Sequence, residues 1–130
     1  MMWSYSGLLM KEDNIIQKKS YDFALRIVKL YIYLKEEKKE YTLGGQILRS
    51  GTSIGANVEE AIGGQSDKDF FAKMSIAYKE ARETHYWIRL LADSEFIKQS
   101  EKESLLNDCD ELLKIIGSIR KTMRNKINNL

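Results

Sequence analysis

The stretch between Gln46 and Trp87 constrains the fold of this chain more than any other part of the sequence. In its first half, apolar and small residues recur at steps of three and four, the spacing of one helix face: Ile47, Gly51, Ile54, Val58 and Ile62. A polar line runs beside that face: Gln46, Ser50, Ser53, Asn57 and Glu60. Because Gly51 and Gly55 let a neighbouring helix approach closely, polar side chains there need hydrogen-bond partners. The stretch predicts a tightly packed helix that carries polar groups into an interface.

The second half of the stretch predicts the helix that packs on the first. Gly63-Gly64 is typical of a helix end, and Ser66 or Asp67 can cap the helix that follows. The apolar residues of this helix again recur at helical steps: Phe70, Met74, Ala77, Ala81, Ile88 and Leu91. We expect its two alanines to face the glycines of the preceding helix, which would make these two helices the closest pair in the protein.

Two more helices are predicted on either side of this pair. The first runs from about Asn14 to Lys38, with Asp13 or Asn14 as its cap. The helix after it begins near Thr42, with Gly44-Gly45 read as either turn or helix. The last helix runs from about Ser100 to the end of the chain. Its apolar residues keep a near-heptad step: Leu105, Cys109, Leu112, Ile116, Ile119 and Met123.

These four helices define the expected architecture. A chain of 130 residues suits one domain with one core, and the absence of proline leaves only glycine and polar turns to interrupt helices. Short turns between four helices predict an all-α, antiparallel up-down-up-down four-helix bundle. We expect this domain to cover residues 10–130 and residues 1–9 to form a loose N-terminal extension.

The first helix carries more apolar surface than one core face can use. Phe23, Ile27 and Leu34 are expected to face the core. The residues predicted on the opposite side are the candidate oligomer interface: Tyr21, Leu25, Val28 and Ile32. We expect this surface to meet another subunit. The alternative is that the helix simply lies at the centre of the bundle.

The charges of the last helix are segregated along its length. Acidic residues dominate positions 101–111, whereas positions 112–130 contain no acid and these bases: Lys114, Arg120, Lys121, Arg124 and Lys126. This order complements the helix dipole, which is the structural interpretation. The functional interpretation is a nucleic-acid-binding patch, although the net charge of +2 is too small to indicate such a partner by itself.

The sequence contains no recognisable catalytic, cofactor or metal site. There is no Glu-x-x-His motif, and the single histidine, His85, lies in a cationic line with Arg82 and Arg89 that is interpreted as surface or interface. Cys109 is interpreted as a small core residue. The remaining polar residues are predicted to form a structural network, in which Glu80 and Glu83 accept hydrogen bonds from Ser53, Asn57 or Arg49, beside Glu60.

Cysteine usage and hydropathy bear on location. A single cysteine excludes an intrachain disulfide and fits a reducing compartment, so we expect a cytoplasmic protein. No apolar run approaches the roughly 18 residues of a membrane helix, so no membrane partner is expected.

Several short segments together resemble one bacterial family. The segments are Ser53-Ile54 followed by Asn57 and Glu60, then Ser66-Asp67-Lys68-Asp69-Phe70, Ser75-Ile76-Ala77, and Glu80-Ala81-Arg82-Glu83-Thr84. In their order and spacing the chain is similar, over about residues 10–125, to the 23S rRNA-intervening sequence proteins, also labelled S23 ribosomal proteins. Gly55 departs from the proline that this family often places after the Ser-Ile pair.

The resemblance implies an antiparallel four-helix bundle that assembles as a homopentamer and has no enzyme activity. A similar bundle is the accessory variability protein of diversity-generating retroelements, a basic pentameric ring that binds nucleic acid and its reverse transcriptase. Two functions follow as hypotheses. The first is a non-enzymatic oligomer that binds structured RNA or DNA through a weak basic surface. The second is a protein–protein adaptor or scaffold in a mobile-element cluster, with a reverse transcriptase or another protein as partner.

Overall fold

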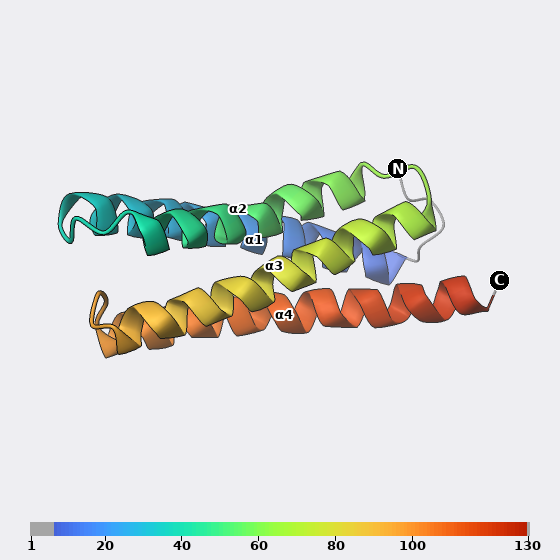
Figure 1. The fold of residues 1–130 in the computed structure, drawn as a ribbon. Coiled ribbons are helices and arrows are strands. Elements are labelled where there is room, and N and C mark those ends of the chain that lie inside the picture. Colours follow the sequence, from blue (N-terminus) through green and yellow to red (C-terminus); the bar gives the residue numbers. More distant parts are fainter. Residues whose placement is uncertain (1–6, 130) are drawn as a thin grey trace.

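The computed structural model describes residues 7–129, whose backbone forms four α-helices joined by short turns. The helices are α1 (Gly7–Glu36), α2 (Thr42–Ile62), α3 (Asp67–Asp93) and α4 (Gln99–Asn128). Consecutive helices run in opposite directions (Figure 1). The predicted all-α, antiparallel four-helix bundle is confirmed. Residues 1–6, which belong to the predicted N-terminal extension, lie outside the described residues, as does residue 130.

The predicted helix ends hold for α3 but not for α1. Ser66 Oγ accepts a hydrogen bond from the backbone N–H of Asp69 at 3.1 Å, so Ser66 caps α3. By contrast, α1 already begins at Gly7, and the prediction that Asp13 or Asn14 caps it is wrong. Most residues between Gly7 and Asn14 are good helix formers and none is glycine or proline, so nothing stops the helix from extending.

The start of α2 settles the position of Gly44-Gly45, which belong to the helix rather than to the turn. The carboxylate of Glu40 accepts hydrogen bonds from the backbone N–H groups of Leu43 at 3.0 Å and Gly44 at 2.9 Å. These are first-turn donors that have no partner within the helix. A glutamate two residues before the helix therefore substitutes for the usual cap.

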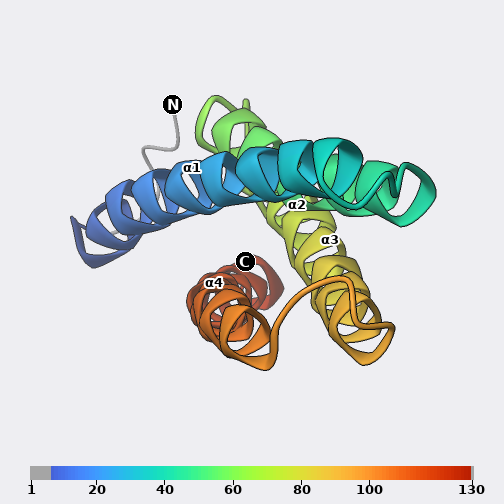
Figure 2. The same ribbon diagram turned by 90° about the vertical axis from the view of Figure 1, so that its left-hand side faces the viewer.

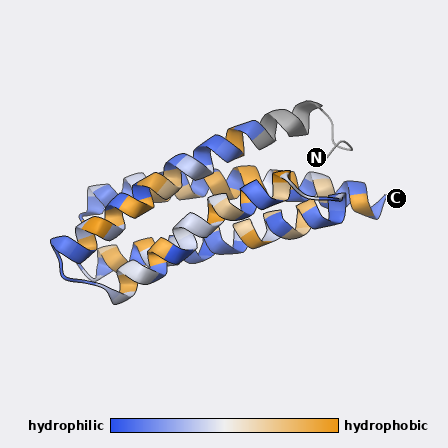
Figure 3. Cartoon of the chain, turned by 90° about the horizontal axis from the view of Figure 1, so that it is seen from above, coloured by the Kyte–Doolittle hydropathy of each residue, from blue (hydrophilic) through white to orange (hydrophobic). Residues whose placement is uncertain are grey.

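The core consists of the predicted apolar lines. Every residue predicted for the apolar faces of α3 and α4 is buried. The α1 helix contributes a buried line of its own: Ile16, Phe23, Ile27, Leu30 and Leu34. Figure 3 shows the resulting alternation of hydrophobic and hydrophilic residues along the helices. Burial of these converging faces is the main force that holds the bundle together.

The four helices do not contact one another equally. The α2 helix packs extensively on both α1 and α3, and α3 packs on α4, whereas α1 and α4 meet over a much smaller area. Figure 2 shows the α1–α2 pair crossing the α3–α4 pair obliquely. Because α1 and α4 diverge, the surface between them is open enough to hold pockets.

Gly51 and Gly55 of α2 face α1, so the prediction that they face the alanines of α3 is wrong. A Cβ built on Gly51 would lie 2.8 Å from Cγ1 and Cγ2 of Ile27, and one built on Gly55 would lie 3.3 Å from the backbone oxygen of Ser20. On α3, Ala81 lies instead against α4. The buried thiol of Cys109 on α4 donates a hydrogen bond to the backbone carbonyl of Ala81 at 3.3 Å. Helical spacing identifies small residues on a face but does not say which neighbour approaches them.

The predicted polar network between α2 and α3 has a different membership. Arg49 is its centre: Nη1 lies 3.3 Å from Glu80 Oε1, and Nη2 forms a second ion pair with Glu83. Trp87 Nε1 donates a hydrogen bond to Glu83 Oε2 at 2.9 Å. Of the donors predicted for these carboxylates, only the arginine reaches them.

The other predicted members of the network are engaged elsewhere. Asn57 Nδ2 donates to the backbone oxygen of Ser53 at 2.8 Å, within α2, because this short side chain can bond back to the preceding turn. Glu60 forms an ion pair with Lys73 at 3.1 Å. Asn57 and Glu60 therefore do not join the network of Glu80 and Glu83, and this part of the prediction is wrong.

A polar contact that the sequence did not single out lies deeper in the same interface. Thr84 Oγ1 donates a hydrogen bond to Ser50 Oγ at 2.9 Å, and both residues are buried. Each hydroxyl thus has a partner in the apolar core, as the cost of burying a polar group requires.

Candidate nucleic-acid-binding face

The predicted basic end of α4 packs on aromatic rings of α3. The guanidinium carbon of Arg120 lies 5.0 Å from the ring centroid of Tyr78 and 5.5 Å from that of Phe71. Arg120 Nε also donates a hydrogen bond to Ser75 Oγ at 3.0 Å. Arg124 lies over the same Phe71 ring at 5.5 Å. Two guanidinium groups therefore share one ring and are held in place by cation–π attraction.

The predicted lysines of this patch have different surroundings. Lys114 and Lys121 are exposed on α4. Lys126 Nζ lies 3.4 Å from Asp67 Oδ2 at the start of α3, so a neighbouring carboxylate balances its charge. The positive character of the predicted patch consequently rests on its other four members.

The arginines of the protein fall into two groups. Arg26 contacts carboxylates of α4, and Arg49 contacts carboxylates of α3. Within the part of the chain that the structure describes, the other arginines form no ion pair with a carboxylate: Arg82, Arg89, Arg120 and Arg124. All four lie on α3 and α4. Their charges are available to an external anion, which guanidinium groups bind with paired N–H donors.

Tyr78 joins the basic end of α4 to a second cationic cluster, the line of Arg82, His85 and Arg89 that was interpreted as surface or interface. Arg89 Nε donates a hydrogen bond to His85 Nδ1 at 3.1 Å, and its guanidinium carbon lies 5.8 Å from the Tyr86 ring centroid. His85 Nε2 lies 3.2 Å from Asp110 Oδ1 of α4. A pocket of about 560 Å³ lies here, and its lining residues are Tyr78, Arg82, Glu83, His85, Tyr86, Arg89 and Leu113.

The signal for this second cluster was present in the sequence. Arg82, His85 and Arg89 recur at helical steps, but periodicity alone could not show that their face adjoins the basic end of α4. Tyr78 and Phe71 share that face about one and three turns before Arg82, and no role was predicted for them.

The predicted oligomer interface is a solvent-exposed apolar stripe on α1. Tyr21, Leu25, Val28 and Ile32 are 37% to 62% exposed, although their apolar character favours burial. The residues on the opposite side of α1 fill the core, as expected. A contiguous exposed apolar surface of this kind is typical of a protein–protein contact. That another subunit covers this surface stays a prediction.

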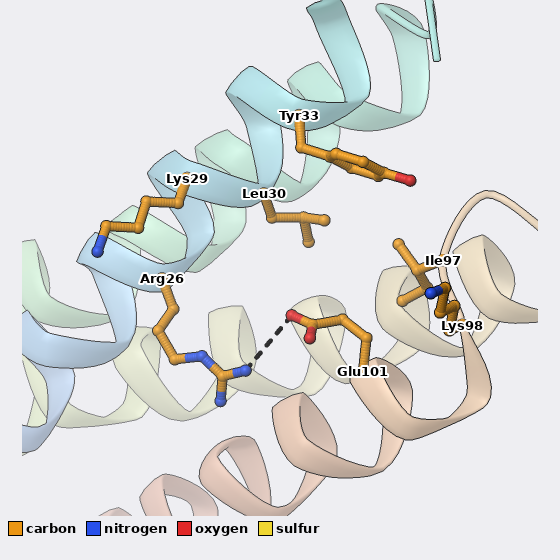
Figure 4. A pocket seen from close by; sticks show the side chains of 7 residues that line it. All are labelled: Arg26, Lys29, Leu30, Tyr33, Ile97, Lys98 and Glu101. Carbon is orange, nitrogen blue, oxygen red and sulfur yellow. Dashed lines mark hydrogen bonds and ion pairs between the residues drawn. The ribbon is translucent and has the colours of Figure 1, made fainter. Parts of the chain in front are cut away.

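A separate pocket of about 530 Å³ lies where α1 diverges from the start of α4 (Figure 4). Leu30, Tyr33 and Ile97 supply its apolar surface, and Lys29 lies at its rim. The guanidinium of Arg26 is turned toward Glu101 of α4, and Nη2 of Arg26 lies 3.4 Å from Oε1 of Glu101 (dashed line in Figure 4). The lining contains no nucleophile beside a general base and therefore does not define a catalytic site.

The remaining candidate groups for chemistry are inert or dispersed. Cys109 is buried, and that burial, reinforced by Asp110 and Asp108, raises the pKa of its thiol to about 12. A thiol this hard to ionise is a poor nucleophile, which agrees with the predicted core role.

Among the described residues, no three histidine, cysteine, aspartate or glutamate side chains are grouped to hold a metal ion. None of the described helices is long and apolar enough to span a membrane.

The model of the 23S rRNA-intervening sequence protein family matches residues 12–118. The chain belongs to this family. A protein of unknown function from the S23 ribosomal protein family of Bacteroides thetaiotaomicron VPI-5482, solved by crystallography, is 51% identical to it. The similarity covers 85% of this chain and 98% of that one, with a TM-score of 0.84. No curated protein matches the chain. The family assignment thus confirms the resemblance seen in the sequence.

Proposed function

We propose that this 23S rRNA-intervening sequence protein is a non-enzymatic homo-oligomer that binds nucleic acid through the α3–α4 face. One observation carries the proposal: the four arginines that form no ion pair with a carboxylate of the described residues all lie on α3 and α4, where three of them pack against aromatic rings. Basic side chains interleaved with aromatic ones suit a ligand with phosphates and bases.

The α1 stripe supports the oligomeric part of the proposal. A closed ring, which we take to be a pentamer, would bury that stripe and repeat the basic face in every subunit. A net charge of +2 per chain would become about +10 per pentamer if charges add. A repeated patch of this kind binds phosphates with a strong dependence on salt, because the driving force is the release of counterions.

The test is a titration of labelled structured RNA and duplex DNA at low and physiological salt. The triple variant Arg120→Gln, Lys121→Gln, Arg124→Gln is measured beside the parent, and we expect it to bind more weakly with a smaller salt dependence. The matched control is Lys35→Gln, Lys38→Gln, Lys39→Gln, which removes the same charge beside the α1–α2 turn, at the opposite end of the bundle from the C-terminus of α4 (Figure 1).

Two results would overturn the proposal. One is binding weaker than ~10⁻⁴ M to both nucleic acids at low salt, which is below ordinary non-specific affinity. The other is an equal loss of nucleic-acid affinity in the two triple variants, which would show that binding depends on net charge and not on this face. The exposed α1 stripe would then favour the second candidate, an adaptor that binds protein partners such as a reverse transcriptase.

A further inference from the structure

The α3–α4 face extends well beyond the basic end of α4. Aromatic and cationic side chains follow one face of α3, and they are Phe71, Tyr78, Arg82, Tyr86 and Arg89. At a rise of 1.5 Å per residue, the 18 steps from Phe71 to Arg89 span roughly 27 Å. A track of this length and composition offers several successive contacts to an extended polymer, rather than one isolated charge.

The pocket in the second cluster is the distinctive part of this track. Its apolar surface comes from Leu113 and the Tyr78 ring, and its cationic walls come from Arg82 and Arg89. Tyr86 also lines the pocket and is 49% exposed. A flat aromatic group with polar edges fits between such walls, because it can stack on rings and on guanidinium planes.

The charges around the pocket also favour a ligand that carries phosphates. Glu83 borders the pocket, but its carboxylate is held by Arg49 and the indole N–H of Trp87. Asp110 lies against His85. Arg82, in contrast, makes no ion pair with any described carboxylate and is exposed.

We propose that this pocket binds an unpaired base of single-stranded nucleic acid, while Arg82 and Arg89 hold the flanking phosphates. The inference rests on the proposed function and deepens it by naming the class of ligand. In a duplex the bases are stacked and paired, so they cannot enter a pocket between two helices. In a single strand every base presents a face for stacking.

The test compares a labelled single-stranded oligonucleotide without secondary structure and the corresponding duplex, both with the full-length protein. We expect the single strand to bind at least about tenfold more tightly at the same salt concentration. Tyr86→Leu keeps an apolar side chain at the pocket but removes the stacking ring. Single-strand affinity should therefore fall about tenfold, while the slope of log affinity against log salt concentration stays unchanged. The double variant Arg82→Gln, Arg89→Gln should reduce the slope of log affinity against log salt concentration by about 1.4, because two phosphate contacts are lost.

The matched control is Tyr33→Leu, which makes the same change at an exposed ring of α1, beside the pocket of Figure 4. We expect this variant to bind like the parent. Helical circular dichroism and melting of each variant establish that the fold is retained.

The outcomes separate this inference from the proposed function. If neither form of nucleic acid binds, the proposed function itself fails. If both forms bind equally, or if Tyr86→Leu binds like the parent, the base pocket is wrong although the basic face still stands. A loss of single-strand affinity in Tyr33→Leu would place the base at the pocket of Figure 4 and would equally overturn the inference.

Discussion

We expect two glycines of α2, Gly51 and Gly45, to respond to substitution in opposite ways because their surroundings differ. A Cβ on Gly51 would lie 2.8 Å from two carbons of Ile27, a side chain with no exposed surface and no room to move. We predict that Gly51→Leu lowers the free energy of unfolding by about 2 kcal/mol through overpacking. Urea denaturation followed by circular dichroism measures the change. A variant that unfolds at the parent's urea concentration would contradict the close α1–α2 contact.

Gly45 provides the control for this substitution. A Cβ built there meets nothing within 4 Å, and the residue lies inside α2. Gly45→Ala should therefore raise the free energy of unfolding by up to about 1 kcal/mol, since alanine loses less backbone entropy on entering a helix. Both glycines look alike in the sequence, so only the tertiary contacts distinguish them.

The buried thiol of Cys109 predicts a pH dependence of stability. Its pKa is about 12 in the folded protein against an ordinary thiol pKa of 9.0, so the unfolded chain ionises first as pH rises. Its contribution to stability is complete below pH 9 and is lost progressively toward pH 12. The parent should therefore lose more stability than Cys109→Ala between pH 8 and pH 10.5 in urea titrations. Parallel curves for the two proteins would show that the thiol is not shielded from ionisation.

At the scale of single elements, the Arg49 ion pairs link α2 to α3. Arg49 is half exposed, but Glu80 and Glu83 are more buried, with side chains 17% and 33% exposed. Arg49→Met should cost about 1 kcal/mol, because it leaves two partly buried carboxylates without their cation. Thermal or urea unfolding measures this cost.

The control for Arg49→Met is Lys18→Met, which breaks the i, i+4 pair between Lys18 and Asp22 on the surface of α1. Both side chains of that pair are more than half exposed. Water screens such a pair, so its loss should cost less than about 0.5 kcal/mol. Equal costs for the two variants would mean that the inter-helix pairs contribute no more than a surface pair.

The elements also show what could be predicted from the sequence and why the rest could not. Apolar residues at steps of three and four identified the buried faces of α3 and α4, because burial follows helical period directly. The neighbour of Gly51 could not be predicted, since a helix has two flanks and the spacing is the same for both. The pairing of Tyr78 with Arg120 depends on how α3 and α4 align, and single-helix patterns do not contain that alignment.

At the scale of the whole molecule, the exposed stripe of α1 predicts a stable oligomer at micromolar concentration. Light scattering should give the mass of a closed assembly, most simply five chains. Leu25→Lys places a charge in the middle of the stripe and should shift the mass toward that of the monomer. A parent that is monomeric would refute the proposed assembly, whereas a dimer or tetramer would refute only the number five.

The control for Leu25→Lys is Ile76→Lys. Ile76 lies on α3, outside the α1 stripe, with an exposure of 41% close to the 47% of Leu25. The Ile76→Lys protein should keep the parent's mass. If it dissociates as well, the subunits meet through a broader surface than the α1 stripe.

The limited contact between α1 and α4 has a consequence for how quickly the chain reaches its native state. The extensive contacts of this bundle join helices that are adjacent in sequence, and the one closure between the chain's two ends is the smallest. A fold built from such local pairings pays little entropy for closing long loops before its contacts form. We expect refolding within milliseconds after dilution from urea, with no slow phase from prolyl isomerisation, because the chain contains no proline. A newly made chain would therefore expose the residues of its core only briefly to unrelated partners.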